Sequence, residues 1–130
     1  MRWHRAGGYS MSTESRVLRT HLEKDAATAV LTVGGEVDAA SVTLLRAGIE
    51  EALDGEPELL VLDLSDVGFF GSAGLGALLF ALEAVPRREL RVVASPQVRR
   101  PIEVTGLDQV LKVFDTLDNA LAPDEDPSIA

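Results

Sequence analysis

Cysteine is absent from the 130 residues of this chain, and histidine is nearly so. The lack of cysteine excludes a disulfide framework, a zinc site with thiolate ligands and a thiol nucleophile. The two histidines, His4 and His21, both lie in the first fifth of the chain. The remaining residues therefore contain no imidazole that could serve as a general base or a metal ligand.

Basic residues and long apolar runs are also scarce. The chain has 12 Lys and Arg against 21 Asp and Glu, which gives a formal charge of −9. Such an acidic excess repels nucleic acid and anionic membrane surfaces and favours a basic partner. No apolar run approaches the roughly 18 residues of a membrane span, and the first ten residues lack the apolar core of a signal peptide. We therefore expect a cytoplasmic protein that binds neither nucleic acid nor a membrane.

The two ends of the chain differ in composition from the middle. Residues 1–15 are polar and lack periodicity, which predicts a disordered arm or an over-long start before Met11. Residues 122–130 predict a disordered acidic tail. Residues 16–121 between them have the length of one domain, and a chain of this size can bury its own core.

The first half of this domain predicts a β-hairpin. Residues 17–22 and 29–33 are rich in apolar and β-branched side chains, with a turn expected at residues 23–25. An amphipathic helix follows, because apolar residues recur at helical spacing over residues 42–53. Asp38 or Ser41 is expected as its N-cap, and Asp54-Gly55 as its stop.

The second half alternates strands and helices. Residues 59–64, LLVLDL, are typical of an inner strand covered on both faces. The next helix is predicted to follow Ser72, to bury Leu75, Leu78, Leu79 and Leu82, and to end at Pro86. The remaining elements are a strand over 90–94, a helix from Ser95-Pro96 to Gly106 that Pro101 kinks or splits, a strand over 110–114 and a short helix over 116–121. This order predicts an α/β fold, a mixed sheet of about four to five strands with helices packed against it.

One stretch, VGFFGSAGLGALLF at residues 67–80, surrounds the lone hydroxyl of Ser72 with glycines. The simplest interpretation is a helix cap beside closely packed glycines. A hydrolase nucleophile elbow needs G-x-S-x-G and a later histidine, but Phe70 stands in place of the first glycine and no histidine follows. A phosphate-binding loop is weakly supported, because the glycine spacing differs and no lysine lies between Lys24 and Lys112.

A third interpretation makes Ser72 the acceptor of a phosphoryl group from another protein. In the first turn of a helix the hydroxyl projects from the fold, and small neighbours leave room for a kinase. A phosphoserine carries about −1.5 to −2 charges, which the positive end of the helix dipole tolerates. Modification could therefore change a docking surface without unfolding the domain.

Three separated segments resemble the STAS domains of anti-sigma factor antagonists. LDLSDVGFFGSAGLGALL is similar to the family signature L-D-L-S-x-V-x-F-x-D-S-S-G-L-G. GGEVDAAS resembles the G-E-L-D segment that opens the first helix, and VTGLDQVLKVFDTLDNAL is similar to the closing helix, strand and helix. The resemblance spans residues 16–121 and implies a small mixed sheet with helices packed against it.

The resemblance also implies a function, that of a non-enzymatic bacterial partner switch without a cofactor or metal. The unphosphorylated domain would bind an anti-sigma factor, usually a histidine-kinase-like ATPase that acts as a serine kinase, and so free a sigma factor. Phosphorylation at Ser72 would release the partner, and a serine phosphatase would restore binding. The positions implied to bind the partner are Glu36, Asp38, Gly71, Ser72, Ala73, Gly74 and Leu75.

Two residues depart from the family pattern. Gly71 replaces the aspartate that usually precedes the serine, which removes a charge from the surface that faces the kinase. Ala73 replaces a second serine or threonine, which leaves Ser72 as the one candidate hydroxyl. An alternative therefore stays open, a constitutive STAS-like structural or regulatory subunit of another complex, such as a transporter, without phosphorylation. The sequence leaves self-association open as well.

The charged residues outside this motif have plainer interpretations. Glu36 and Asp38 lie two apart at a strand end, where carboxylates usually face solvent, and nothing near them suggests an electrophile or a metal. A basic concentration in the second half is predicted to be a solvated face, because no aromatic residues interleave it. It comprises Arg87, Arg88, Arg91, Arg99 and Arg100.

Overall fold

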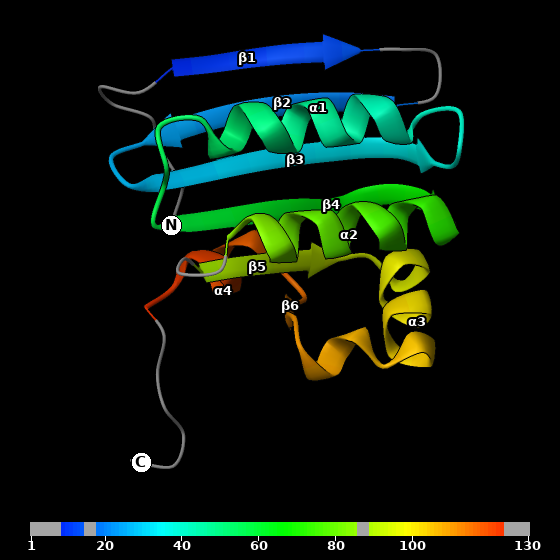
Figure 1. Ribbon diagram of the computed structural model, residues 1–130. Coiled ribbons are helices and arrows are strands. Elements are labelled where there is room, and N and C mark those ends of the chain that lie inside the picture. Colours follow the sequence, from blue (N-terminus) through cyan, green and yellow to red (C-terminus); the bar gives the residue numbers. More distant parts are fainter. Residues whose placement is uncertain (1–8, 15–17, 86–88, 124–130) are drawn as a thin grey trace, which may run out of the picture.

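The structure, a computed structural model, describes residues 9–14, 18–85 and 89–123. Its strands form one sheet whose order follows the sequence (Figure 1). They are β1 (Tyr9–Glu14), β2 (Leu18–Asp25), β3 (Thr28–Val37), β4 (Leu59–Phe70), β5 (Glu89–Ala94) and β6 (Lys112–Phe114). The pairs β1–β2 and β2–β3 are antiparallel, and β3 to β6 are parallel. The predicted mixed α/β fold is confirmed.

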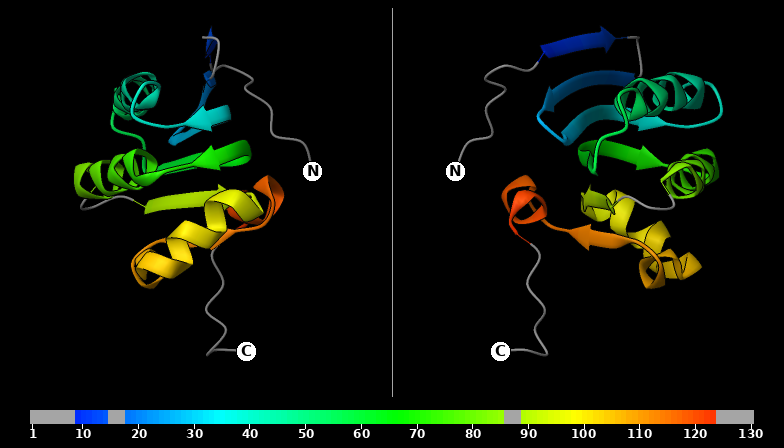
Figure 2. Two further views of the ribbon diagram at one scale, coloured as in Figure 1. Left: turned by 90° about the vertical axis from the view of Figure 1, so that its right-hand side faces the viewer. Right: turned by 60° about the vertical axis from the view of Figure 1, so that its left-hand side comes forward.

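Helices connect the parallel strands. They are α1 (Val42–Leu53), α2 (Ser72–Ala84) and α3 (Pro96–Thr105), and α4 (Leu117–Leu121) follows β6. Figure 2 shows α1 and α2 on one face of the sheet and α4 on the opposite face. Strands added in one direction by right-handed crossovers place their helices on the same face. The main core lies beneath these crossover helices, and a smaller cluster lies beneath α4.

The predicted hairpin of β2 and β3 is confirmed, but its turn lies further along the chain. Residues 23–25 continue the ladder, and Asp25 pairs with Thr28. The loop is Ala26-Ala27, with Ala26 at φ 53°. The expectation of a turn over residues 23–25 was wrong because charged side chains in a strand do not interrupt its backbone pairing.

The strand β1 lies within the segment that the sequence suggested to be a disordered arm. Its residues pair with β2 from Tyr9 opposite Lys24 to Glu14 opposite Arg19. Pairing along the free edge of β2 uses backbone groups and does not require an apolar pattern, so YSMSTE gave no signal. The sheet therefore has six strands where four to five were expected. Residues 1–8 of the predicted arm and 124–130 of the predicted tail lie outside the described residues.

Of the four leucines predicted to be buried, helix α2 buries only Leu78, and small residues form the rest of its buried face. Gly74, Ala77, Leu78 and Ala81 form its buried face. Leu75 and Leu82 are half-buried, and Leu79 is 43% exposed. Small residues let the helix axis approach the sheet, so the longer side chains point along its flanks. The helix ends at Ala84, and Pro86 lies outside the described residues.

Helix α3 is continuous despite the proline within it. Pro101 lies inside Pro96–Thr105, and Gly106 ends the helix at φ 80°. The predicted division into two pieces is not observed. The N–H that Pro101 lacks would have bonded the carbonyl of Gln97, an exposed residue in the first turn, so its loss leaves no buried gap.

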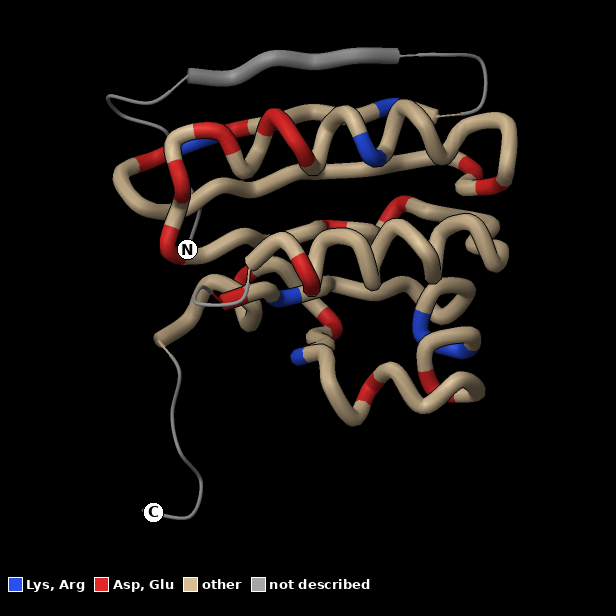
Figure 3. The backbone as a smooth tube through the Cα atoms, in the orientation of Figure 1, with Lys and Arg blue, Asp and Glu red and all other residues tan. Residues whose placement is uncertain are grey.

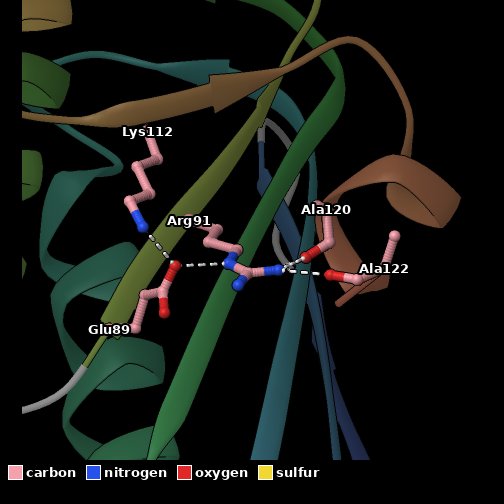
Figure 4. Close-up of polar contacts among 5 residues, drawn as sticks. All are labelled: Glu89, Arg91, Lys112, Ala120 and Ala122. Carbon is pink, nitrogen blue, oxygen red and sulfur yellow. Dashed lines mark hydrogen bonds and ion pairs between the residues drawn. The ribbon is translucent and has the colours of Figure 1, made fainter. Parts of the chain in front are cut away.

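The buried side chain of Arg91 forms hydrogen bonds to the last described helix of the domain and the residue after it (Figure 4). It is 5% exposed, and its Nη1 donates to the carbonyl oxygens of Ala120 at 2.7 Å and Ala122 at 2.8 Å. Its Nε donates to Glu89 Oε2 at 2.7 Å, and Lys112 Nζ donates to the same oxygen at 2.8 Å. The expected solvated face is therefore wrong for Arg91, which joins β5, β6 and the end of α4.

The other predicted basic residues differ from Arg91. Arg99 pairs at 2.7 Å with Asp115, whose side chain is 79% exposed, and Arg100 is exposed. Arg87 and Arg88 lie outside the described residues.

We predict that the stability supplied by Glu89 depends on pH. Hydrogen bonds from Arg91 and then Lys112 hold the pKa of Glu89 below its ordinary value of 4.5. A carboxyl with a lowered folded pKa stabilises the fold above its unfolded pKa, and this stabilisation is lost as the pH falls through the folded pKa. Glu89→Gln should lower the unfolding free energy by about 1 kcal/mol near pH 7, and by clearly less near pH 3. Urea unfolding of both proteins at each pH measures the difference, and an equal loss at the two pH values contradicts the prediction.

Candidate functional site

The carboxyl ends of β3 and β4 bring two distant segments of the chain together. The strands are parallel, with Glu36 opposite Phe69 and Val37 opposite Phe70. The N–H of Gly71 also donates to the carbonyl of Val37 at 3.0 Å. The loop after β3 and the start of α2 therefore meet at the edge where open α/β sheets commonly bind their ligands.

The loop after β3 is held by Asp38. Its Oδ1 accepts the N–H groups of Ala40 and Ser41, both at 3.0 Å. The buried Ser41 hydroxyl donates to the carbonyl of Glu36 at 2.7 Å and accepts from the N–H of Asp38 at 3.0 Å. Of the two residues expected at the N-cap of α1, Ser41 takes the position, and no side chain caps the helix. Asp38 instead closes the turn that precedes α1. The carboxylate of Asp38 accepts hydrogen bonds within the loop, while Glu36 is exposed near the carboxyl end of β3.

Ser72 is the first residue of α2 and is exposed. Gly71 takes the N-cap position, with φ −90° and ψ −168°, and no side chain caps the helix. The interpretation of Ser72 as the helix cap is therefore wrong, because the serine lies one residue too far along. Its hydroxyl is at the surface, on a helix that carries no charge before Glu83 (Figure 3).

The remaining predicted positions divide between surface and core. Gly71, Ala73 and Leu75 are half-buried. Gly74 is buried, and a Cβ built on it would come within 2.6 Å of Phe70 Cε1. Gly74 therefore supports the site from below and does not belong to its surface.

Sequence reasoning missed Phe69, whose side chain is 52% exposed. A Cβ built on Gly71 would lie 3.2 Å from Phe69 Cε2 and 3.4 Å from Cζ, so the ring covers the glycine. The signal was present in the sequence, since neighbours on a strand point to opposite faces. Because the side chain of Phe70 points into the core, the side chain of Phe69 must point to the opposite face of the sheet.

The site is a surface, and the hollow described next lies elsewhere on the molecule. A hollow of about 530 Å³ is lined by Glu58, Leu82, Val85, Glu89, Leu90, Val110 and Lys112. Glu58 and Glu89 stand at the amino ends of their strands, opposite the edge that holds Ser72. Among the described residues, no group of three or more His, Asp or Glu could hold a metal ion. An exposed hydroxyl and an exposed aromatic ring within four residues of one another suit contact with a protein.

A comparison with known protein families shows which family this chain belongs to. The model of the STAS domain matches residues 19–120. The chain belongs to the STAS domain family. The resemblance seen in the three sequence segments is thereby confirmed.

Two similar proteins are named as anti-sigma factor antagonists. The STAS domain is 42% identical over 95 residues to the anti-sigma-F factor antagonist RsfB of Mycobacterium tuberculosis, covering 72% of this chain and 78% of RsfB. A crystal structure of an anti-sigma factor antagonist from Mycobacterium paratuberculosis is 38% identical with a TM-score of 0.76, covering 80% of this chain and 91% of the other. These relatives are regulatory proteins by name.

The antagonist SpoIIAA has been solved in two forms that both resemble this STAS domain. The unphosphorylated form is 27% identical with a TM-score of 0.59, covering 78% of this chain and 92% of that one. The phosphorylated Bacillus form is 27% identical with a TM-score of 0.55, covering 78% of this chain and 96% of that one.

In the part of the chain that the structure describes, no helix is both long and apolar enough to cross a membrane.

Proposed function

We propose that this STAS domain is an anti-sigma factor antagonist that acts as a phosphorylation switch. It binds an anti-sigma factor of the histidine-kinase-like ATPase type through the surface around Ser72, and phosphorylation of Ser72 releases that partner. The observation that carries the proposal is the exposed Ser72 hydroxyl in the first turn of α2. The names of RsfB and SpoIIAA support the choice of partner.

The chemical step is a phosphoryl transfer from ATP. The Oγ of Ser72 attacks the γ-phosphorus, the bond to the β-phosphate oxygen breaks and ADP leaves, while a base of the kinase takes the hydroxyl proton. A serine phosphatase reverses the state by hydrolysis to serine and inorganic phosphate.

The consequence for binding follows from where the new charge lies. A dianion at the first turn of α2 interacts favourably with the helix dipole, by about 0.3–1 kcal/mol, so the fold persists. In a complex the same dianion must lose water against a partner surface that fits a neutral hydroxyl. The modification therefore weakens docking while leaving the domain folded.

Substitutions at Ser72 test the proposal. The domain is mixed with each purified histidine-kinase-like anti-sigma factor from the same genome, and the dissociation constant is measured by calorimetry. Ser72→Asp should weaken the complex at least about tenfold, because it places a carboxylate at the docking surface. Ser72→Ala should bind like the wild type and take up no phosphate from ATP. Gln109→Asp adds the same charge at an exposed residue elsewhere and should change the affinity less than about twofold.

Three results would overturn the switch. They are the absence of binding to every anti-sigma factor tested, phosphate on a residue other than Ser72 by mass mapping, and equal affinity of Ser72→Asp and Ser72→Ala. The last result together with no phosphorylation would favour the constitutive subunit.

A further inference from the structure

We infer that Phe69, with its ring laid over Gly71, is the apolar anchor by which this domain recognises its anti-sigma factor. The inference rests on the proposed function and adds a residue that binds the partner. It also names the chemistry of the partner, an apolar pocket with a basic side chain at its rim.

The first argument is the position of the exposed ring. The large apolar side chains that are exposed among the described residues are Phe69, Leu79, Val104 and Val110. Of these, Phe69 alone lies at the carboxyl edge of the parallel strands, in the segment that leads directly into Ser72. Aromatic side chains bury a large apolar area when a partner covers them and contribute strongly to interface energetics.

The second argument is that the ring is held in place before binding. The position of a Cβ on Gly71 lies within ordinary contact distance or closer of two ring atoms, Cε2 and Cζ. The ring therefore rests on bare backbone that only glycine provides. A side chain already fixed in one orientation loses little conformational entropy when a partner covers it.

The third argument is the charge beside the ring. Glu36 is the neighbour of Phe69 across the β3–β4 pair and is exposed. Directly opposite residues in a ladder point to the same face, so the carboxylate and the ring stand together. With a chain charge of −9, the complementary surface is an apolar pocket bordered by Lys or Arg.

The anchor also connects recognition with the switch. Ser72 follows Gly71 directly, so a phosphate on its hydroxyl adds charge to the same short segment as the ring, which must be stripped of water to enter the pocket. Charge at that place opposes the desolvation of the ring. This explains how glycine at residue 71 fits the switch, because a carboxylate there would both displace the ring and add charge.

The test measures the affinity of four variants for the purified anti-sigma factor that binds the wild type. Phe69→Ala should weaken binding at least about tenfold, because it removes the anchor. Gly71→Ala keeps the ring but forces it aside, and should weaken binding by about three- to tenfold. Glu36→Lys should lower the association rate, with an effect that shrinks in high salt. Val104→Ala removes an apolar side chain that is 75% exposed on α3 and should leave affinity within about twofold.

Urea midpoints of all four variants identify any loss caused by unfolding, and Gly71→Ala keeps the test decisive if Phe69→Ala proves unstable. Wild-type binding with both Phe69→Ala and Gly71→Ala within about twofold of it would overturn the anchor and leave the proposed function intact. Failure of the wild type to bind any anti-sigma factor would overturn the proposed function itself.

Discussion

Arg91→Met should destabilise the domain by about 3 to 5 kcal/mol, the largest effect expected from any single change described above. The guanidinium is 5% exposed and donates to two carbonyl oxygens and one carboxylate oxygen. Methionine fills similar volume but donates nothing, so the Ala120 carbonyl stays buried without its partner. Equilibrium urea unfolding measures the loss.

Arg99→Met is the matched control for this prediction. Arg99 also forms a 2.7 Å ion pair, but with Asp115, whose side chain is 79% exposed. An ion pair exposed to water contributes little, so the loss should stay below about 1 kcal/mol. Amide exchange adds a local reading, since Arg91→Met should lower protection over Leu117–Leu121 more than elsewhere. A value for Arg91→Met within about 1 kcal/mol of Arg99→Met would contradict the assigned role.

Gly74→Ala should destabilise the domain by about 2 kcal/mol net, although alanine is the better helix former. A Cβ on Gly74 would lie 2.6 to 2.8 Å from three atoms of the Phe70 ring, which is only 5% exposed and packs in the core. Alanine in place of glycine within a helix stabilises by about 1 kcal/mol, which is less than the cost of displacing a buried ring. Thermal or urea unfolding shows whether the substitution lowers or raises the unfolding free energy.

The same helix supplies the control, with the opposite expected sign. A Cβ on Gly76 meets its nearest atom, Arg46 Nη2, at 3.8 Å. Gly76→Ala should therefore stabilise by about 0.5 to 1 kcal/mol through helix propensity alone. Adding Phe70→Leu to Gly74→Ala should recover part of the loss, because the smaller side chain vacates the overlap. Stabilisation by Gly74→Ala, or no recovery in the double variant, would contradict the packing argument.

The fold was largely predictable because its signals are local. The apolar run at residues 59–64 and the helical spacing over 42–53 each specify one element without knowledge of the rest. The wrong predictions concern features that depend on contacts between residues far apart in the sequence. The pairing of β1 depends on the free edge of β2, and the buried face of α2 depends on how closely small residues let the helix approach the sheet.

The site was predictable in part for the same reason. The motif around Ser72 is continuous in the sequence, so the exposed hydroxyl at the start of α2 was anticipated. Phe69 was missed because two adjacent phenylalanines look alike until strand direction decides which one enters the core. The burial of Arg91 was not predicted because two of its partners are the backbone carbonyls of Ala120 and Ala122. Every residue has a backbone carbonyl, so the sequence does not show which ones an arginine will bind.

The parallel strands separate the contacts of Arg91 from the surface around Ser72 along their length. Arg91 and Glu89 lie toward the amino end of β5, whereas Phe69 and Ser72 lie at the carboxyl edge of β4. Mutations that alter the contacts of Arg91 can therefore change the heat tolerance of the domain while the surface that a partner would cover stays the same.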